Sequence, residues 1–153
     1  MRLEEEIKQI RGFKSEQHKA VVNLMYTYGW MMGRMKENLK DYDLTPQQYN
    51  VLRILRGAFP EPLSTLDIRN RMLDRMSDAS RIVDRLCKKG LLKSKTCSFD
   101  KRKVDVSISE PGLGILATID REQSDFDHLM EGLSTEDAKH LNDTLDRLRN
   151  HGL

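Results

Sequence analysis

The sequence predicts a mainly α-helical fold that carries one small β-hairpin. Two segments have side chains typical of helix starts, and a third has apolar residues at helical spacing before a glycine. Further along, apolar and polar residues alternate, which is typical of a strand. The length of 153 residues suits one domain with an appendage.

The first helix of the central unit is predicted to begin at Pro46. Thr45 suits the N-cap position, and Pro46 has no amide that would need a partner. Gln48 completes a capping box with Thr45, because its side chain can reach back to the N-cap amide. The helix is expected to run to about Arg56.

The same start pattern returns at Ser64, which is followed three residues later by Asp67. This second helix is short and is expected to end near Leu73. Asp74 is then expected to cap a third helix that extends to Lys89. The apolar residues of this third helix recur at helical spacing, at Ala79, Ile82, Val83 and Leu86.

After Gly90, the expected end of the third helix, the period changes from helical to alternating. Two strands are predicted, from Leu92 to Cys97 and from Lys103 to Ser109, joined by a turn around Ser98 to Arg102. Helix, short helix, helix and basic hairpin is the order of a winged helix-turn-helix. In that motif the third helix enters the DNA major groove.

The charge is segregated along the chain. Residues 64–103 contain 12 Lys or Arg and 5 Asp or Glu, whereas the rest of the chain contains 14 basic and 19 acidic residues. A basic block in an acidic frame is typical of a polyanion-binding module, because release of counterions from phosphates drives such binding. A solvated surface with clustered charge is the alternative.

Helices are also expected on both sides of this unit. Upstream, one apolar stripe comprises Val21, Leu24, Tyr28, Met31, Met35 and Leu39. Downstream, a long helix carries Leu113, Leu116, Ile119, Gln123, Phe126 and Met130, and a last helix opened by Ser134 carries Ala138, Leu141, Leu145 and Leu148. One winged helix cannot cover this much apolar surface, so a two-fold dimer is expected.

The predicted organisation therefore has three parts. Residues 1–40 form an N-terminal dimerisation region, residues 44–109 a winged helix-turn-helix DNA-binding domain, and residues 110–153 the C-terminal dimerisation helices.

Three motifs, in this order and spacing, resemble the MarR family of bacterial transcriptional regulators. They are Leu44–Leu52, Ser80–Leu91, and Asp100–Lys101–Arg102 followed by Val104, Val106, Ile108, Ser109 and Gly112. The resemblance covers about Leu44 to Leu148. It implies a triangular homodimer with interlocked terminal helices that reads a pseudo-palindromic operator. It also implies a regulator, most often a repressor, whose DNA binding is loosened by a small ligand that is often phenolic or aromatic.

Candidate DNA contacts on the third helix share one face or lie close beside it. They are Ser77, Ser80, Arg81, Arg85 and Lys88. Arg81 is the strongest candidate, because a guanidinium can bind guanine or clamp a phosphate. Its alternative is an ion pair with Asp78 or Asp84. Ser77 could instead cap the helix, and Arg85 could form an internal salt bridge.

In the hairpin, Asp100 and Arg102 match the family's Asp-x-Arg wing tip. The resemblance implies that Arg102 enters the minor groove while Asp100 holds its guanidinium in line. Lys95 and Lys101 are expected to contact phosphates. A turn capped by Asp100 with solvated lysines is the alternative.

A ligand pocket is expected at Met25, Tyr26, Trp30 and Met31, which form a soft cluster containing aromatic rings. An ordinary methionine-rich core or dimer interface is the alternative interpretation. No cofactor is expected beyond a small aromatic effector.

The sequence favours neither an enzyme nor a metal site. It has no glycine-rich phosphate loop, Gly-x-Ser-x-Gly elbow or His-Glu-x-x-His motif, and its four histidines are dispersed. Cys87 and Cys97 lie ten residues apart and match neither a disulfide framework nor a zinc motif, which fits a reducing cytoplasm. The least polar stretch, Val21 to Met35, is interrupted by Asn23, Thr27 and Arg34, so no membrane association is expected. Two alternatives remain: a winged-helix protein-interaction module, and a redox-responsive regulator that uses Cys97.

Overall fold

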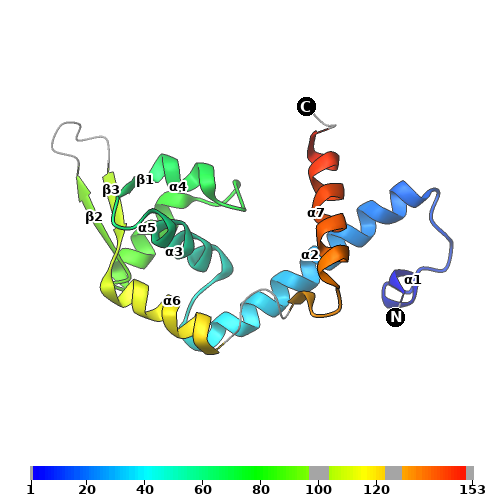
Figure 1. Ribbon diagram of the computed structural model, residues 1–153, viewed down its shortest axis with the longest axis horizontal. Coiled ribbons are helices and arrows are strands. Elements are labelled where there is room, and N and C mark those ends of the chain that lie inside the picture. The colour runs from blue at the N-terminus through cyan, green and yellow to red at the C-terminus, as the bar shows by residue number, and fades with distance from the viewer. Residues whose placement is uncertain (1, 97–103, 123–128, 151–153) are drawn as a thin grey trace. The chain divides into compact units, whose positions relative to one another are not determined.

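The computed structural model describes residues 2–96, 104–122 and 129–150 (Figure 1). The chain divides into two compact units, residues 1–113 and 114–153. The elements within 1–113 are α1 (Leu3–Glu6), α2 (Glu16–Leu39), the short 3-10 helix η1 (Lys40–Tyr42), α3 (Pro46–Ala58), β1 (Leu63–Ser64), α4 (Thr65–Arg71), α5 (Ala79–Lys88), β2 (Leu92–Thr96) and β3 (Val104–Ile108). They are followed by α6 (Glu110–Glu122) and α7 (Thr135–Asn150).

The sheet has three antiparallel strands in the order β1-β3-β2. β2 and β3 form the predicted hairpin, in a register that runs from Leu92 opposite Ile108 to Thr96 opposite Val104. β1 was not predicted. It has only two residues and pairs with β3 at Leu63 opposite Val106, so no local alternation marks it as a strand.

The core of the first unit lies where α3, α4 and α5 contact one another and the sheet. Its fully buried side chains come from all of these elements, and they include Leu52, Leu55, Ile68, Leu86 and Val106. Burying one such side chain stabilises a fold by about 1.5–3 kcal/mol. This packing holds α5 on a helical scaffold, with one face of the helix turned away from the core.

The helix starts at Thr45 and Ser64 are confirmed. The Thr45 hydroxyl accepts a hydrogen bond from the Gln48 amide at 3.2 Å, and Gln48 Oε1 accepts one from the Thr45 amide at 3.0 Å. Ser64 and Asp67 make the equivalent pair at 3.1 and 3.3 Å. Both capping boxes satisfy amides that a helix leaves without internal partners.

The predicted start of the third helix was wrong. α5 begins at Ala79, and its N-cap is Asp78, whose carboxylate accepts a hydrogen bond from the Arg81 amide at 3.1 Å. The Asp74 carboxylate instead accepts a hydrogen bond from the Met76 amide at 3.0 Å. An aspartate bonded to an amide two residues further on closes a turn, so Asp74 precedes a turn rather than a helix.

The junction between the hairpin and α6 is closely packed. The Ser109 hydroxyl donates a hydrogen bond to the Gly90 carbonyl at 2.7 Å and accepts one from the Gly112 amide at 3.2 Å. Gly90 ends the α5 segment with φ +73°, a conformation that favours glycine. A Cβ atom on Gly112 would overlap the carbonyl oxygen of Leu91 and lie 2.8 Å from Ile108 Cγ1.

The long downstream helix was predicted to reach Met130. In the described part of the chain α6 ends at Glu122. The predicted positions Gln123 and Phe126 lie outside the described residues. Met130 lies in a 3-10 turn rather than in an α-helix. The last predicted helix is confirmed as α7. Asp137 pairs with Ser134 across its start, and the Ser134 hydroxyl accepts from the Asp137 amide at 3.1 Å.

Candidate nucleic-acid interface

α5 separates its side chains into two faces. Ala79, Val83 and Leu86 are buried against the core. The opposite face is exposed and carries Ser80, Arg81, Asp84, Arg85 and Lys88. At 3.6 residues per turn, these five positions span about 140° of the helix circumference. The net charge of this exposed face is +2, from three cations and one carboxylate.

Arg81 lies in the first turn of α5 with an exposed side chain. Its backbone amide is bound by the Asp78 carboxylate, but its guanidinium has no ion-pair partner among the described residues. The same holds for Arg85 within the described ranges, so neither of the two ion-pair alternatives is observed there. Both guanidiniums are therefore available to a ligand. Arg81 also lies at the N-terminus of α5, which is the positive end of the helix dipole.

Ser77 lies in the turn before α5 rather than on the helix. Its hydroxyl donates a hydrogen bond to Asp74 Oδ2 at 2.6 Å, and this bond is the largest of the interactions that hold the pKa of Asp74 below its ordinary value. The capping role considered for Ser77 belongs to Asp78. From α3, Asn50 Oδ1 accepts a hydrogen bond from the Leu73 amide at 3.0 Å, which ties the other end of the turn to the scaffold.

In the hairpin, Lys95 is exposed on β2. Asp100, Lys101 and Arg102 lie outside the described residues, as does Cys97. The roles predicted for these four residues therefore stay predictions. Cys87, on α5, is a half-buried free thiol.

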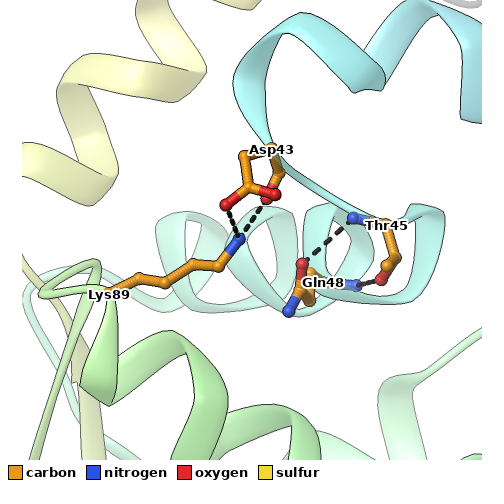
Figure 2. A network of polar contacts seen from close by, with 4 residues as sticks. All are labelled: Asp43, Thr45, Gln48 and Lys89. Atoms are coloured by element: carbon orange, nitrogen blue, oxygen red, sulfur yellow. Dashed lines mark hydrogen bonds and ion pairs between the residues drawn. The ribbon is translucent and has the colours of Figure 1, made fainter.

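The far end of α5 is bound to the corner between α2 and α3 (Figure 2). Lys89 Nζ donates to the Asp43 carboxylate at 2.7 Å and also to its backbone carbonyl. Asp43 has φ +52°, in the left-handed region, and this bend directs its carbonyl and its carboxylate toward the same ammonium. The contact joins residues 46 positions apart in the sequence.

A groove of about 1200 Å³ lies beside this contact. Its cationic residues come from the end of α2 and the end of α5, and they are Lys36, Lys40, Arg85, Lys88 and Lys89. Its acidic residues are Glu37 and Asp43, and Asp43 is already paired with Lys89. An excess of cations beside apolar lining residues such as Met32 and Leu44 suits an anionic, partly apolar ligand.

The four residues of the predicted ligand cluster on α2 do not all line one cavity. Tyr26 and Trp30 line a smaller cavity of about 590 Å³ together with residues of α1, whereas Met25 and Met31 are not among its lining residues. Met25 is 70% exposed. A hydrogen bond with Glu6 raises the pKa of the Tyr26 hydroxyl, so α1 contributes a polar group to this cavity.

Sequence reasoning missed the basic groove. The signal was present, because Lys36 and Lys40 lie four residues apart on one helix face and Lys88 and Lys89 end another helix. Their proximity depends on the bend at Asp43, which no local pattern predicts.

The described ranges contain no cluster of three or more His, Cys, Asp or Glu side chains that could hold a metal ion. No helix in the described part of the chain is long and apolar enough to cross a membrane.

The helix order, the antiparallel sheet and the exposed basic face of α5 define a winged helix-turn-helix protein. A comparison with protein-family models matches residues 42–103 to the MarR family. The chain is 26% identical over 131 residues to the HTH-type transcriptional regulator MhqR of Bacillus subtilis (strain 168), covering 85% of this chain and 89% of MhqR.

Solved structures agree with this assignment. A MarR transcription factor from Planctomyces limnophilus is 29% identical, with a TM-score of 0.67 and coverage of 91% of this chain and 98% of that one. A mutant MarR from E. coli complexed with operator DNA shares the fold at 20% identity, with a TM-score of 0.76 and coverage of 90% and 99%. The organohalide-sensing regulator RdhR, in its 2,4-dichlorophenol-bound form, shares it at 20% identity, with a TM-score of 0.79 and coverage of 94% and 88%.

In sequence and in fold the chain is similar to members of the MarR family of transcriptional regulators. Members of this family are regulators of transcription and not enzymes.

Proposed function

We propose that this protein is a homodimeric, cytoplasmic repressor that binds a pseudo-palindromic operator and is released by a small ligand. The observation that carries the proposal is the exposed basic face of α5, in which Arg81 and Arg85 have no ion-pair partner among the described residues. In a winged helix-turn-helix this helix reads base edges in the major groove, and its first turn lies nearest the bases. Ser80, Arg81, Arg85 and Lys88 supply the contacts, Ser77 and Lys95 support them, and Asp100, Lys101 and Arg102 act at the wing tip.

Exposed apolar residues on the terminal helices support the dimer. On α2, Val21, Leu24 and Tyr28 are 57%, 45% and 59% exposed. On α7, Leu141 and Leu148 are 40% and 60% exposed. A surface of this kind is costly to leave in water, and a two-fold dimer buries the same surface from both copies. These are the dimerisation regions, residues 1–40 and 110–153, that flank the DNA-binding domain at 44–109.

Selection of binding sites from a random duplex pool at physiological salt tests this function, combined with sedimentation of the free protein. We expect a dimer and an enriched pseudo-palindrome whose half-sites lie about 34 Å, or one helical turn, apart. A folded dimer that enriches no sequence would instead favour a winged-helix protein-interaction module. Release of DNA by a mild oxidant, and not by a ligand, would favour the redox regulator that uses Cys97.

The basic groove between the ends of α2 and α5 is the proposed effector site. RdhR was solved with 2,4-dichlorophenol bound, and an acidic phenol or aromatic carboxylate would match the cations of the groove. Its walls include Arg85 and Lys88, so a bound anion would compete with DNA phosphates for the same helix and favour a released state. The cluster of Met25, Tyr26, Trp30 and Met31 stays a second candidate, through the smaller cavity at Tyr26 and Trp30.

Replacing Lys36 by serine is expected to raise, by about fivefold, the concentration of 2,4-dichlorophenol that releases half of the operator DNA. Lys36 is exposed, and loss of one cation from such a solvent-screened site removes about 1 kcal/mol of attraction. Affinity for DNA without ligand stays the same, because Lys36 lies on α2 and not on α5. Fluorescence anisotropy of labelled operator measures both values.

Lys14→Ser is the matched control, since Lys14 is an exposed lysine that does not line the groove. If the two variants release half of the operator at the same 2,4-dichlorophenol concentration, the groove is excluded as the effector site. The cavity at Trp30 then becomes the candidate.

A further inference from the structure

The turn between α4 and α5, residues 72–78, presents two apolar side chains to solvent. Leu73 is 83% exposed and Met76 is 94% exposed, and among the described large apolar residues of 44–113 these two are the most exposed. Met72, in the same segment, is 3% exposed and belongs to the core. Of the three apolar residues in this turn, Met72 is therefore buried, whereas Leu73 and Met76 are exposed.

This exposure is held in place by hydrogen bonds rather than left to a loose loop. Asp74 binds the Met76 amide and the Ser77 hydroxyl, and Asn50 binds the Leu73 amide. Each of the two exposed residues thus has its own backbone amide bound to a side chain. A backbone that is already fixed loses less conformational entropy when a partner binds, so binding is less costly.

The surroundings of the turn are cationic. Exposed arginines precede it, lie within it and follow it, at Arg69, Arg71, Arg75 and Arg81. The two acidic groups of the segment, Asp74 and Asp78, are directed to backbone amides and to a hydroxyl. An apolar pair among arginines suits a partner that carries both negative charge and small apolar groups.

The DNA major groove has this chemistry, because thymine presents a methyl group there between two rows of phosphates. We propose that Leu73 and Met76 form a contact surface for thymine methyl groups and so help to determine which operator is bound. This inference rests on the proposed function. It adds a source of specificity outside α5 that needs no hydrogen bond, and a flexible thioether such as Met76 can adapt its packing to a methyl group.

The test uses the full-length protein and the operator that it selects from a random pool. Each thymine of one half-site is replaced in turn by deoxyuridine, which removes only the methyl group. For the wild-type protein, one or two of these replacements weaken binding by about three- to tenfold, as loss of a methyl contact predicts. Met76→Ala removes the contact from both protomers of the dimer, so the unmodified operator is bound about ten- to one-hundredfold more weakly, and the same deoxyuridine replacements have no further effect.

The variant keeps its fold, since the Met76 side chain is exposed, and thermal unfolding verifies this. The salt dependence of binding also stays unchanged, because the side chain contacts no phosphate. Leu73→Ala is measured in the same way, and it is expected to lose discrimination at a neighbouring thymine. Leu66→Ala is the matched control, since Leu66 is 55% exposed and lies on α4, outside the turn.

The outcomes separate the two proposals. An operator that is enriched and bound, but whose affinity is unchanged by Met76→Ala, by Leu73→Ala and by methyl removal, would overturn this inference alone. The methyl contact is likewise excluded if the losses from Met76→Ala and from deoxyuridine simply add. If the wild-type protein enriches no operator, the proposed function fails first, and this inference fails with it.

Discussion

Replacing Arg81 by alanine is expected to weaken operator binding by about thirtyfold or more, because the substitution removes one contact from each protomer of the proposed dimer. Arg81 lies in the first turn of α5, where a recognition helix approaches the bases, and its guanidinium has no ion-pair partner among the described residues. One bidentate contact to guanine is worth about 1–3 kcal/mol. The side chain is exposed, so the free energy of unfolding stays within about 0.5 kcal/mol of the wild type.

Anisotropy titrations at several salt concentrations distinguish the two kinds of contact. If Arg81 binds a base, the variant loses its preference at one base pair of each half-site. Loss of a phosphate contact from each protomer instead weakens binding to every sequence and lowers the salt slope by about two. Arg11→Ala is the control for the loss of one positive charge, since Arg11 is exposed and precedes α2. If both variants bind DNA like the wild type, α5 does not read the operator through Arg81.

Gly112→Ala is expected to destabilise the protein by about 3 kcal/mol or more. A Cβ atom at this position would overlap the Leu91 carbonyl oxygen and lie 2.8 Å from a side-chain carbon of Ile108. Relief requires α6 to move away from the hairpin, which would stretch the bonds that the Ser109 hydroxyl makes to Gly90 and Gly112. Substitutions that force backbone to shift in a packed site are among the most destabilising.

Gly114→Ala in the same helix is the matched control. Nothing lies within 4 Å of a Cβ atom at Gly114. Alanine has a higher helix propensity than glycine, so this variant is expected to gain about 0.5–1 kcal/mol. Urea unfolding followed by circular dichroism measures both free energies, and equal effects of the two substitutions would show that the contact at Leu91 is not tight.

Features that depend on a few neighbouring residues were predicted well. The capping boxes at Thr45 and Ser64, the glycine stop at Gly90 and the alternation in β3 all involve residues within three or four positions of one another. Local physics decides these features, so the sequence alone is enough to predict them.

Features that depend on choices between equivalent side chains, or on distant contacts, were not predicted. Asp74 and Asp78 could each cap a helix, and only the hydrogen bonds of the folded turn show that Asp74 binds Met76 and Ser77 instead. β1 exists because Leu63 meets Val106, 43 positions further along the chain. In the candidate site, the exposed face of α5 followed from periodicity, whereas the basic groove required the bend at Asp43.

The strand order β1-β3-β2 leaves β2 as an outer strand of the sheet, with one row of backbone amides and carbonyls facing outward. Such a strand can pair with a strand of another molecule, and charged side chains, lysine above all, discourage this. Lys93 and Lys95 are both exposed on β2. These two lysines therefore disfavour pairing between β2 strands of two molecules. For Lys95, which is proposed to act in operator binding, selection for solubility and selection for DNA binding would act on the same position.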